Sequence, residues 1–343
     1  MTTHLPSQFG IEALLGLTPI LLFLAVLIFM DSFKLVRIRL VVAVMLAGAL
    51  AAALSYAIAG PLMDAMHVSF ARYSHFYAPF VEEALKAVVI IALMRADRVG
   101  FLIDAAILGV AVGAGFSVAE NIYYAYTFPD SDIGMWMVRG LGTAIMHGGV
   151  SAIFAVTAEA LENKEPDSRV LIFVPGLLIA ASIHSIYNQF QAWPVAAAAG
   201  TLVLLPLGLL LAFDKSEHEV HNWLIHDYET HEHLLADIEN GTFAHSQAGR
   251  MIKTLAARFS AEMAANLFAY IKLHTQLVLR AEEMLLAKEN GRPIPPGHDA
   301  ESFARLHALE KTIGRTAMLT VWPHLKFSHQ ELFELHQLEA RAT

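Results

Sequence analysis

Hydrophobic residues form long runs over the first 213 residues of the chain and short, interrupted groups after that point. Seven runs each hold about 20 predominantly apolar residues, the length that an α-helix needs to cross a bilayer. They lie near residues 11–30, 38–60, 78–95, 101–126, 136–160, 169–191 and 195–213. The pattern predicts an all-α, polytopic membrane protein with about seven transmembrane helices.

Residues 214–343 differ in character, because charged residues interrupt their apolar groups. We therefore expect two domains, a transmembrane domain over residues 1–213 and a soluble helical domain over residues 214–343. Charged residues make up 16% of the chain, against roughly 25% in soluble proteins, and the deficit lies in the first domain. His226, His231 and His233 of the second domain could bind a metal ion, but we favour a solvated polar helix face.

The loops between the runs differ in their content of lysine and arginine. Alternate loops and the segment after the last run hold eight of these residues: Lys34, Arg37, Arg39, Arg95, Arg98, Lys164, Arg169 and Lys215. The other loops hold Arg72 and Arg139, and we interpret Arg139 as an anchor for lipid headgroups. Because basic loops stay in the cytoplasm, the count predicts an outside N-terminus and a cytoplasmic second domain. We expect a multi-pass protein of the cell (inner) membrane.

Composition excludes several classes of function. The net charge of -9 gives no basic surface for nucleic acid. The absence of cysteine excludes disulfides, thiolate metal sites and a cysteine nucleophile. No basic residue precedes the first run, and three follow it closely, so we expect a transmembrane helix there and not a cleavable signal peptide.

Ionisable and amide side chains interrupt four of the apolar runs. A charge inside a span costs a few kcal/mol or more, so each such residue is a functional candidate. In chain order they are Glu82, Glu83 and Lys86 in the third run, Glu120 in the fourth, His147 in the fifth, and His184 and Asn188 in the sixth. Since successive runs alternate in direction, a rise of roughly 1.5 Å per residue places Glu82, Glu83, Glu120, His147 and His184 about 8–17 Å below the outer surface. The sequence predicts one shared site in the outer half of the membrane.

Helical spacing refines this site. Lys86 follows Glu82 by four residues and Glu83 by three, so it can pair with either carboxylate. Adjacent glutamates point about 100° apart, and we expect them to have different roles. His184 and Asn188 share one helix face. Glycines also give the fourth run a small-residue face for close helix packing: Gly109, Gly113 and Gly115.

Two hydrolytic chemistries fit these residues. In the first, Glu120, His147 and His184 bind zinc with a position left for water, and Glu82 or Glu83 is the general base. In the second, no metal is needed: a buried glutamate activates water directly, and His184 with Asn188 stabilises the oxyanion. The H-E-x-x-H spacing of soluble metalloproteases is absent, so the spacing leaves both open. A transporter or lipid-handling protein could use the same Glu/His/Lys cluster for proton or ion coupling.

Four motifs carry these residues over roughly residues 75–190. They are E-E-x-x-K after Ala-Pro, G-x-G-F-x-x-x-E-N over residues 113–121, the isolated His147, and H-x-x-x-N from His184 to Asn188. Together they resemble the PrsW family of intramembrane proteases, which belongs with the type II CAAX prenyl endopeptidases and bacteriocin-processing proteins. The prenyl endopeptidases carry histidine where this chain has Glu120, which argues against prenyl-protein processing.

The resemblance implies an intramembrane endopeptidase in which the pair Glu82 and Glu83 is central to catalysis. From the residues themselves we expect Lys86 and Asn188 among the catalytic residues as well. It also implies a single-pass membrane protein as substrate, of the anti-sigma-factor type, cut first at its outer side (site-1 type). Lipid bilayer, substrate and a homo-oligomer or cytoplasmic partner bound through the second domain are the expected partners.

Overall fold

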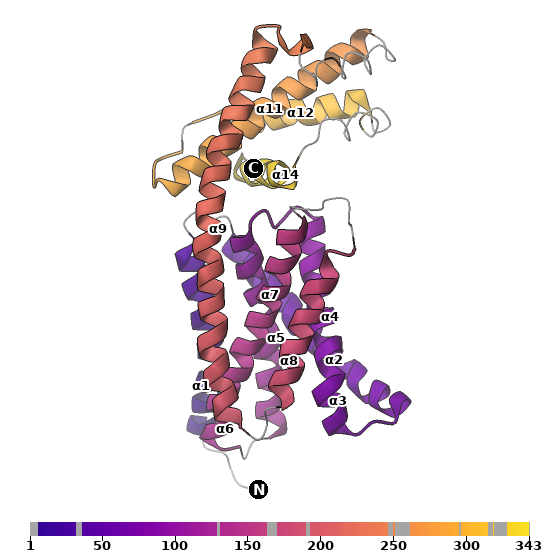
Figure 1. Ribbon diagram of the computed structural model, residues 1–343, viewed down its shortest axis with the longest axis vertical. Coiled ribbons are helices and arrows are strands. Elements are labelled where there is room, and N and C mark those ends of the chain that lie inside the picture. Colours follow the sequence, from indigo (N-terminus) through magenta and orange to yellow (C-terminus); the bar gives the residue numbers. More distant parts are fainter. Residues whose placement is uncertain are drawn as a thin grey trace. The chain divides into compact units, whose positions relative to one another are not determined.

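The computed structural model describes residues 6–31, 36–128, 131–162, 170–189, 193–245, 250, 261–294, 296–314, 318 and 328–342. Within these ranges the chain is helical and contains no strand (Figure 1). Contacts divide it into two compact units, Met1–Glu217 and His218–Thr343. The predicted all-helical fold class is confirmed.

The first unit is a helical bundle. Its helices are α1 (Pro6–Met30), α2 (Ile38–Met66), α3 (Phe70–Phe76), α4 (Ala78–Arg95), α5 (Leu102–Thr127), α6 (Ile133–Val138), the π-helical turn η1 (Arg139–Thr143), α7 (Ala144–Glu162), α8 (Phe173–Gln189) and the beginning of α9 (Pro194–Glu239). The short helix α3 begins after Ser69, whose hydroxyl accepts a hydrogen bond from the backbone N–H of Arg72.

Among the residues that the structure describes in this unit, three helices are long and apolar enough to cross a membrane. They are α2, α5 and the continuous segment Ile133–Glu162 formed by α6, η1 and α7. Two shorter apolar segments, Leu14–Phe29 and Pro194–Leu209, lie in α1 and α9. The charged residues that α4 carries near its middle lower its hydropathy, and α8 has only 17 residues.

Helix α5 forms the centre of the bundle and is buried along most of its length. It packs against α7, α2 and α1. A Cβ atom at Gly109 would lie 2.6 Å from the Cα of Ala152 on α7, and one at Gly113 would overlap the backbone of His147. A Cβ at Gly115 would overlap the backbone of α2. The predicted small-residue face therefore exists, and it lets two helices approach α5 closely.

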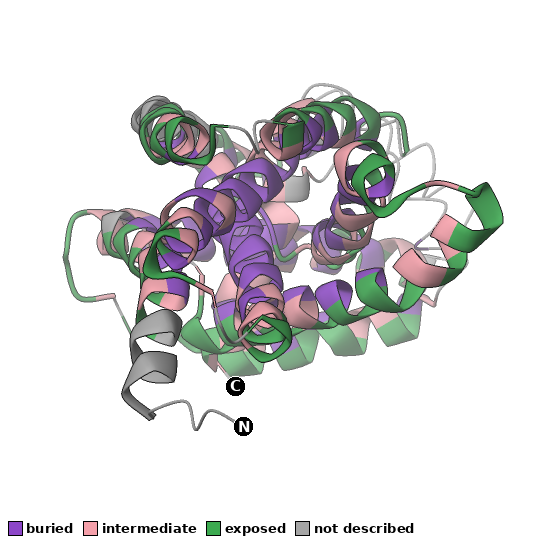
Figure 2. Ribbon diagram, turned by 90° about the horizontal axis from the view of Figure 1, so that it is seen from below, coloured by how far each residue is buried: buried purple, intermediate pink, exposed green. Residues whose placement is uncertain are grey.

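The outward faces of the bundle are apolar. Large exposed residues include Phe29 on α1, Leu46 on α2, Val88 on α4 and Val203 on α9. Figure 2 shows buried residues gathered on the central helices and exposed residues on the outward faces. An apolar surface of this extent indicates a lipid environment.

The second unit is helical as well. It contains the remainder of α9, the short turn η3 (Phe243–His245), α11 (Ala261–Glu289), α12 (Asp299–Ile313) and α14 (His329–Ala342). His231 is buried here and its Nδ1 lies 2.8 Å from Glu282 Oε1. The interpretation of His231 as part of a solvated face is therefore wrong, because its side chain is buried within the unit against Glu282 of α11. The side chain of His226 lies outside the described residues.

Candidate active site

Five of the predicted site residues line one cavity of about 490 Å³. Helix α4 contributes Glu82, α5 contributes Glu120, α7 contributes His147, and α8 contributes His184 and Asn188. The sequence predicted that these four helices share a site, and the cavity brings their side chains together. Glu83 and Lys86 lie behind the cavity wall and are almost fully buried.

The buried pair Glu83 and Lys86 supports His184 from behind. One oxygen of Glu83 lies 2.6 Å from the Lys86 ammonium and 2.7 Å from Nδ1 of His184. The lysine holds Glu83 ionised, so the imidazole donates its Nδ1–H to that carboxylate. In the neutral ring, Nε2 then has no proton and faces the cavity.

Glu82 points away from this pair and toward the cavity. Its side chain is 16% exposed, whereas that of Glu83 is 2% exposed. An oxygen of Glu82 lies 3.8 Å from His184 Nε2. The expected difference between the two glutamates is present: Glu83 contacts the residues behind the site, and Glu82 faces the space that a substrate can reach.

His147 lies between a cation and a carboxylate. Lys86 Nζ is 3.3 Å from its Nδ1, and Glu120 Oε2 is 3.2 Å from its Nε2. Because an ammonium can only donate, Nδ1 accepts and the ring proton faces Glu120. The ring also packs against Phe116 and, edge-on, against His184, with centroids 4.9 and 4.8 Å apart.

Arg139 belongs to this site, which the sequence did not indicate. It is 8% exposed, and its Nη2 lies 3.1 Å from Glu120 Oε2. Its Nε donates to Oδ1 of Asn121 at 2.8 Å, and its guanidinium stacks over the ring of Tyr124. The interpretation of Arg139 as an anchor for lipid headgroups is therefore wrong, because Arg139 is buried and forms an ion pair with Glu120 inside the bundle.

Asn188 lines the cavity but uses its amide for a contact with α3. Its Nδ2 donates to the backbone carbonyl of Ser74 at 3.0 Å, and the hydroxyl of neighbouring Ser185 donates to that of His75. These two bonds attach the end of α3 to α8. The sequence analysis proposed the amide of Asn188 as a hydrogen-bond donor to an oxyanion, but this amide donates to the backbone instead.

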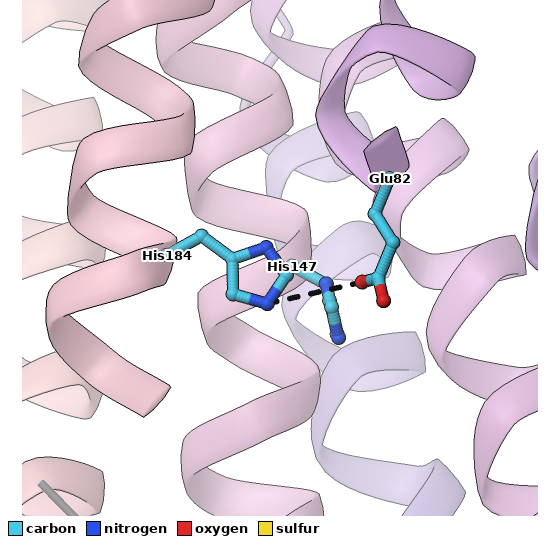
Figure 3. Close-up of side chains that lie close together, drawn as sticks. All are labelled: Glu82, His147 and His184. Atoms are coloured by element: carbon cyan, nitrogen blue, oxygen red, sulfur yellow. Dashed lines mark ion pairs between the residues drawn. The ribbon is translucent and has the colours of Figure 1, made fainter. Parts of the chain in front are cut away.

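Three side chains could hold a metal ion. Figure 3 shows Glu82, His147 and His184 converging from three helices, and one ligand atom from each lies within 4.8 Å of the others. His184 has the support that metal-bound histidines usually have, because its other nitrogen donates to a carboxylate. His147 meets the ligand distance, but Lys86 and Glu120 contact its two ring nitrogens, so one of these contacts must open before it can bind a metal. On that condition the donor set fits a divalent metal.

The predicted ligand set differs in one member. The sequence suggested Glu120 as the carboxylate ligand, whereas the group of close ligand atoms contains Glu82. Glu120 is instead paired with Arg139 and His147. Helix α4, and not α5, turns its carboxylate toward the two histidines.

A Glu/His cluster facing a cavity inside an apolar helical bundle is the arrangement expected of a membrane-embedded hydrolase. Residues 36–212 match the model of a family described as PrsW family intramembrane metalloprotease. The chain belongs to this family and is an intramembrane protease. No curated protein and no solved structure matches the chain.

Proposed function

We propose that this protease cleaves a single-pass membrane protein near its outer face. The observation that carries the proposal is the cavity in which Glu82, His147 and His184 meet. The family assignment supports peptide hydrolysis by this cluster, not the proton or ion coupling that similar residues serve in transporters.

The proposed topology has seven spans, α1, α2, α4, α5, the segment Ile133–Glu162, α8 and the first part of α9, with the N-terminus outside. Because Arg139 is buried in the bundle, it no longer counts as a basic residue of the outer loops. Only Arg72 then remains on the outer side, and the difference in basic residues between the two sides becomes larger. The site then lies in the outer half of the cell (inner) membrane. Residues 214–343 are proposed to form a cytoplasmic domain that binds a partner or a second copy.

The chain's own residues have separate tasks in the proposed reaction. Glu82 faces the cavity, and in the metal-free reaction it takes a proton from the attacking water and returns it to the leaving amine. Glu83 keeps Nε2 of His184 directed at the same space, and Lys86 keeps Glu83 ionised. Low exposure of the whole set excludes bulk water and strengthens these interactions.

Glu82, His147 and His184 would hold the metal that the family name implies, with zinc as the proposed ion because it prefers imidazole and carboxylate ligands. Such an ion lowers the pKa of water and polarises the scissile carbonyl. In a metal-free reaction Glu82 alone would perform the activation of water. Glu82 is essential in both cases.

The proposed substrate is a membrane-anchored regulator of the anti-sigma-factor type. Members of the family that the motifs resemble are associated with trimming such proteins from the outer side. A cavity in the outer half of the membrane favours an extracytoplasmic juxtamembrane segment as the cut site. A cleavage site mapped to the cytoplasmic end of the substrate helix would refute this.

The deciding experiment uses purified protein reconstituted in liposomes with a single-pass substrate. Cleavage and bound metal are measured together for the wild type, Glu82→Gln and Glu83→Gln. We expect Glu82→Gln to abolish cleavage and Glu83→Gln to weaken it. Full cleavage by both variants would remove this cluster from the reaction, and a wild type that cleaves without bound metal would remove zinc.

A further inference from the structure

Arg139 reaches the site through an unusual backbone feature. The turn Arg139–Thr143 is π-helical, and the N–H of Ala144 donates to the carbonyl of Arg139, five residues earlier. Turns of this kind are rare and are found frequently at functional sites. Gly140 and Gly142 let neighbouring helices pack against the turn, because a Cβ at Gly140 would collide with α1 and one at Gly142 with α8 and α9.

From this turn the guanidinium of Arg139 contacts three side chains of α5. Arg139 forms an ion pair with Glu120, donates to Asn121 and covers the ring of Tyr124. Asn121 is held in turn, since its Nδ2 donates to the carbonyl of Gly16 on α1 at 2.7 Å. The arginine therefore has a fixed orientation, set by α1 and α5 together.

Glu120 receives two partners on the same oxygen. Arg139 Nη2 lies 3.1 Å and His147 Nε2 lies 3.2 Å from Oε2. The side chain of Glu120 is 14% exposed, and a buried carboxylate of this kind needs a cation beside it. Arg139 thus keeps Glu120 charged and directs it at His147.

We propose that Arg139 is a positioning residue of the protease, which acts through Glu120 to fix the orientation of His147. Lys86 holds the other nitrogen of the ring, so the imidazole is clamped between two fixed groups. The inference rests on the proposed role of His147 in the active site. It assigns Arg139 and the π-helical turn a purpose that the family motifs do not include.

A purely structural ion pair would have a different signature. Removing both charges of a structural pair restores stability and leaves activity intact. Removing them from a positioning pair restores stability but not activity, because His147 loses its orientation. Lysine at position 139 keeps the charge but lacks the planar fork that serves Glu120 and Asn121 together.

The experiment compares Arg139→Gln, Arg139→Lys, Glu120→Gln and the double variant Arg139→Gln/Glu120→Gln. Substrate cleavage is measured in liposomes, and the ¹⁵N resonances of His147 are recorded on the metal-free protein. We expect Arg139→Gln to lower kcat about 10- to 100-fold with KM unchanged, the range typical of residues that support a ligand. Arg139→Lys should recover part of this loss, and the double variant should be no slower than Glu120→Gln. The His147 resonances should shift in Arg139→Gln.

Arg72 on α3 provides the matched control, because Arg72→Gln removes the same charge from an exposed position. Wild-type kcat in Arg139→Gln, or in the double variant, would overturn the proposal. A double variant whose loss equals the product of the single losses would also overturn it. If Arg139→Gln does not fold, Arg139→Lys and the charge-neutral double variant decide. His147→Ala separates the two proposals, since full cleavage by that variant would refute the proposed active site itself.

Discussion

Nδ1 of His184 lies 2.7 Å from the carboxylate of Glu83. Glu83 therefore binds His184, whereas the adjacent Glu82 faces the cavity. The cause is helical geometry: neighbours on α4 point about 100° apart, so one faces α8 and Lys86 while the other faces the open space. The division has consequences for each residue.

Glu83→Gln should impair the protease less than Glu82→Gln. The glutamine oxygen can still accept from His184, but the negative charge that orients the ring is gone. We expect kcat to fall about 10- to 100-fold in Glu83→Gln, and about 10²- to 10⁴-fold in Glu82→Gln if it is the proton acceptor. Cleavage rates under saturating substrate give both values, and the reverse order would contradict the assigned roles.

Lys86→Met should destabilise the first unit. The substitution leaves Glu83 buried without its cation, a change that costs about 3–5 kcal/mol. The double variant Lys86→Met/Glu83→Gln should recover most of this loss, because neither side chain is then charged. Denaturant titration of the purified protein in micelles measures the free energy of unfolding. Equal stability of the single and double variants would show that the pair contributes little.

The two histidines should differ in their importance for metal binding. His184 has a carboxylate behind it, whereas His147 has an ammonium. We expect His184→Ala to lose more zinc affinity than His147→Ala. Competition with a chelating dye measures both affinities, and Asn188→Ala is a control on the same face of α8. Chelation should abolish cleavage in the wild type, and zinc should restore it.

Much of this site could be predicted from the sequence. Glu82, His147 and His184 interrupt apolar runs at matching depths, and alternating helix direction brings such residues together. The spacing of Lys86 from both glutamates was equally clear, although it could not decide between them. Which of the two glutamates pairs with Lys86 depends on how α4 is rotated about its axis relative to α8, and sequence spacing does not determine this rotation.

The partners of Glu120 and the place of Arg139 in the site could not be predicted. Helix α5 is apolar and buried on nearly all sides, so no polar face reveals how it is rotated. Arg139 seemed to belong to a loop because it lies near the end of an apolar run. The π-helical turn changes the register of the helix at that point, and regular 3.6-residue spacing does not anticipate it.

Gly113→Ala should damage the site without touching any ionisable residue. Its Cβ would overlap the backbone of His147, so α7 must move away from α5. We expect lower stability and a reduced kcat. The control is Gly200→Ala on α9, where a Cβ meets nothing within 4 Å. Alanine favours a helix over glycine, so this control should be neutral or slightly stabilising. Equal activity of the two variants would show that α5 and α7 tolerate the displacement.

The stability of the second unit should depend on pH through His231. Burial alone would lower the pKa of this histidine, but its hydrogen bonds to Glu282 and Glu331 outweigh burial and raise the pKa to about 10. The folded state therefore holds an extra proton between about 6.5, the ordinary value, and 10. The stabilisation is complete below 6.5 and is lost as pH rises through 10. Nearby His274 has the opposite behaviour, because burial and the charge of His231 lower its pKa to about 3.

Hydrogen exchange of α9, α11 and α14 in the full chain can test this relationship. Protection should fall in the wild type as the pH rises from 6.5 toward 10, and it should fall as well below 6.5, where unfolding lets His274 take up a proton. His231→Gln should remove the alkaline dependence and lower protection at neutral pH, because buried Glu282 then loses its ion pair with His231. The matched control is His307→Gln, since His307 also contacts two carboxylates but is 55% exposed. Exposed pairs contribute little to stability, so this variant should behave like the wild type. An unchanged alkaline profile in His231→Gln would mean that another group controls the unit.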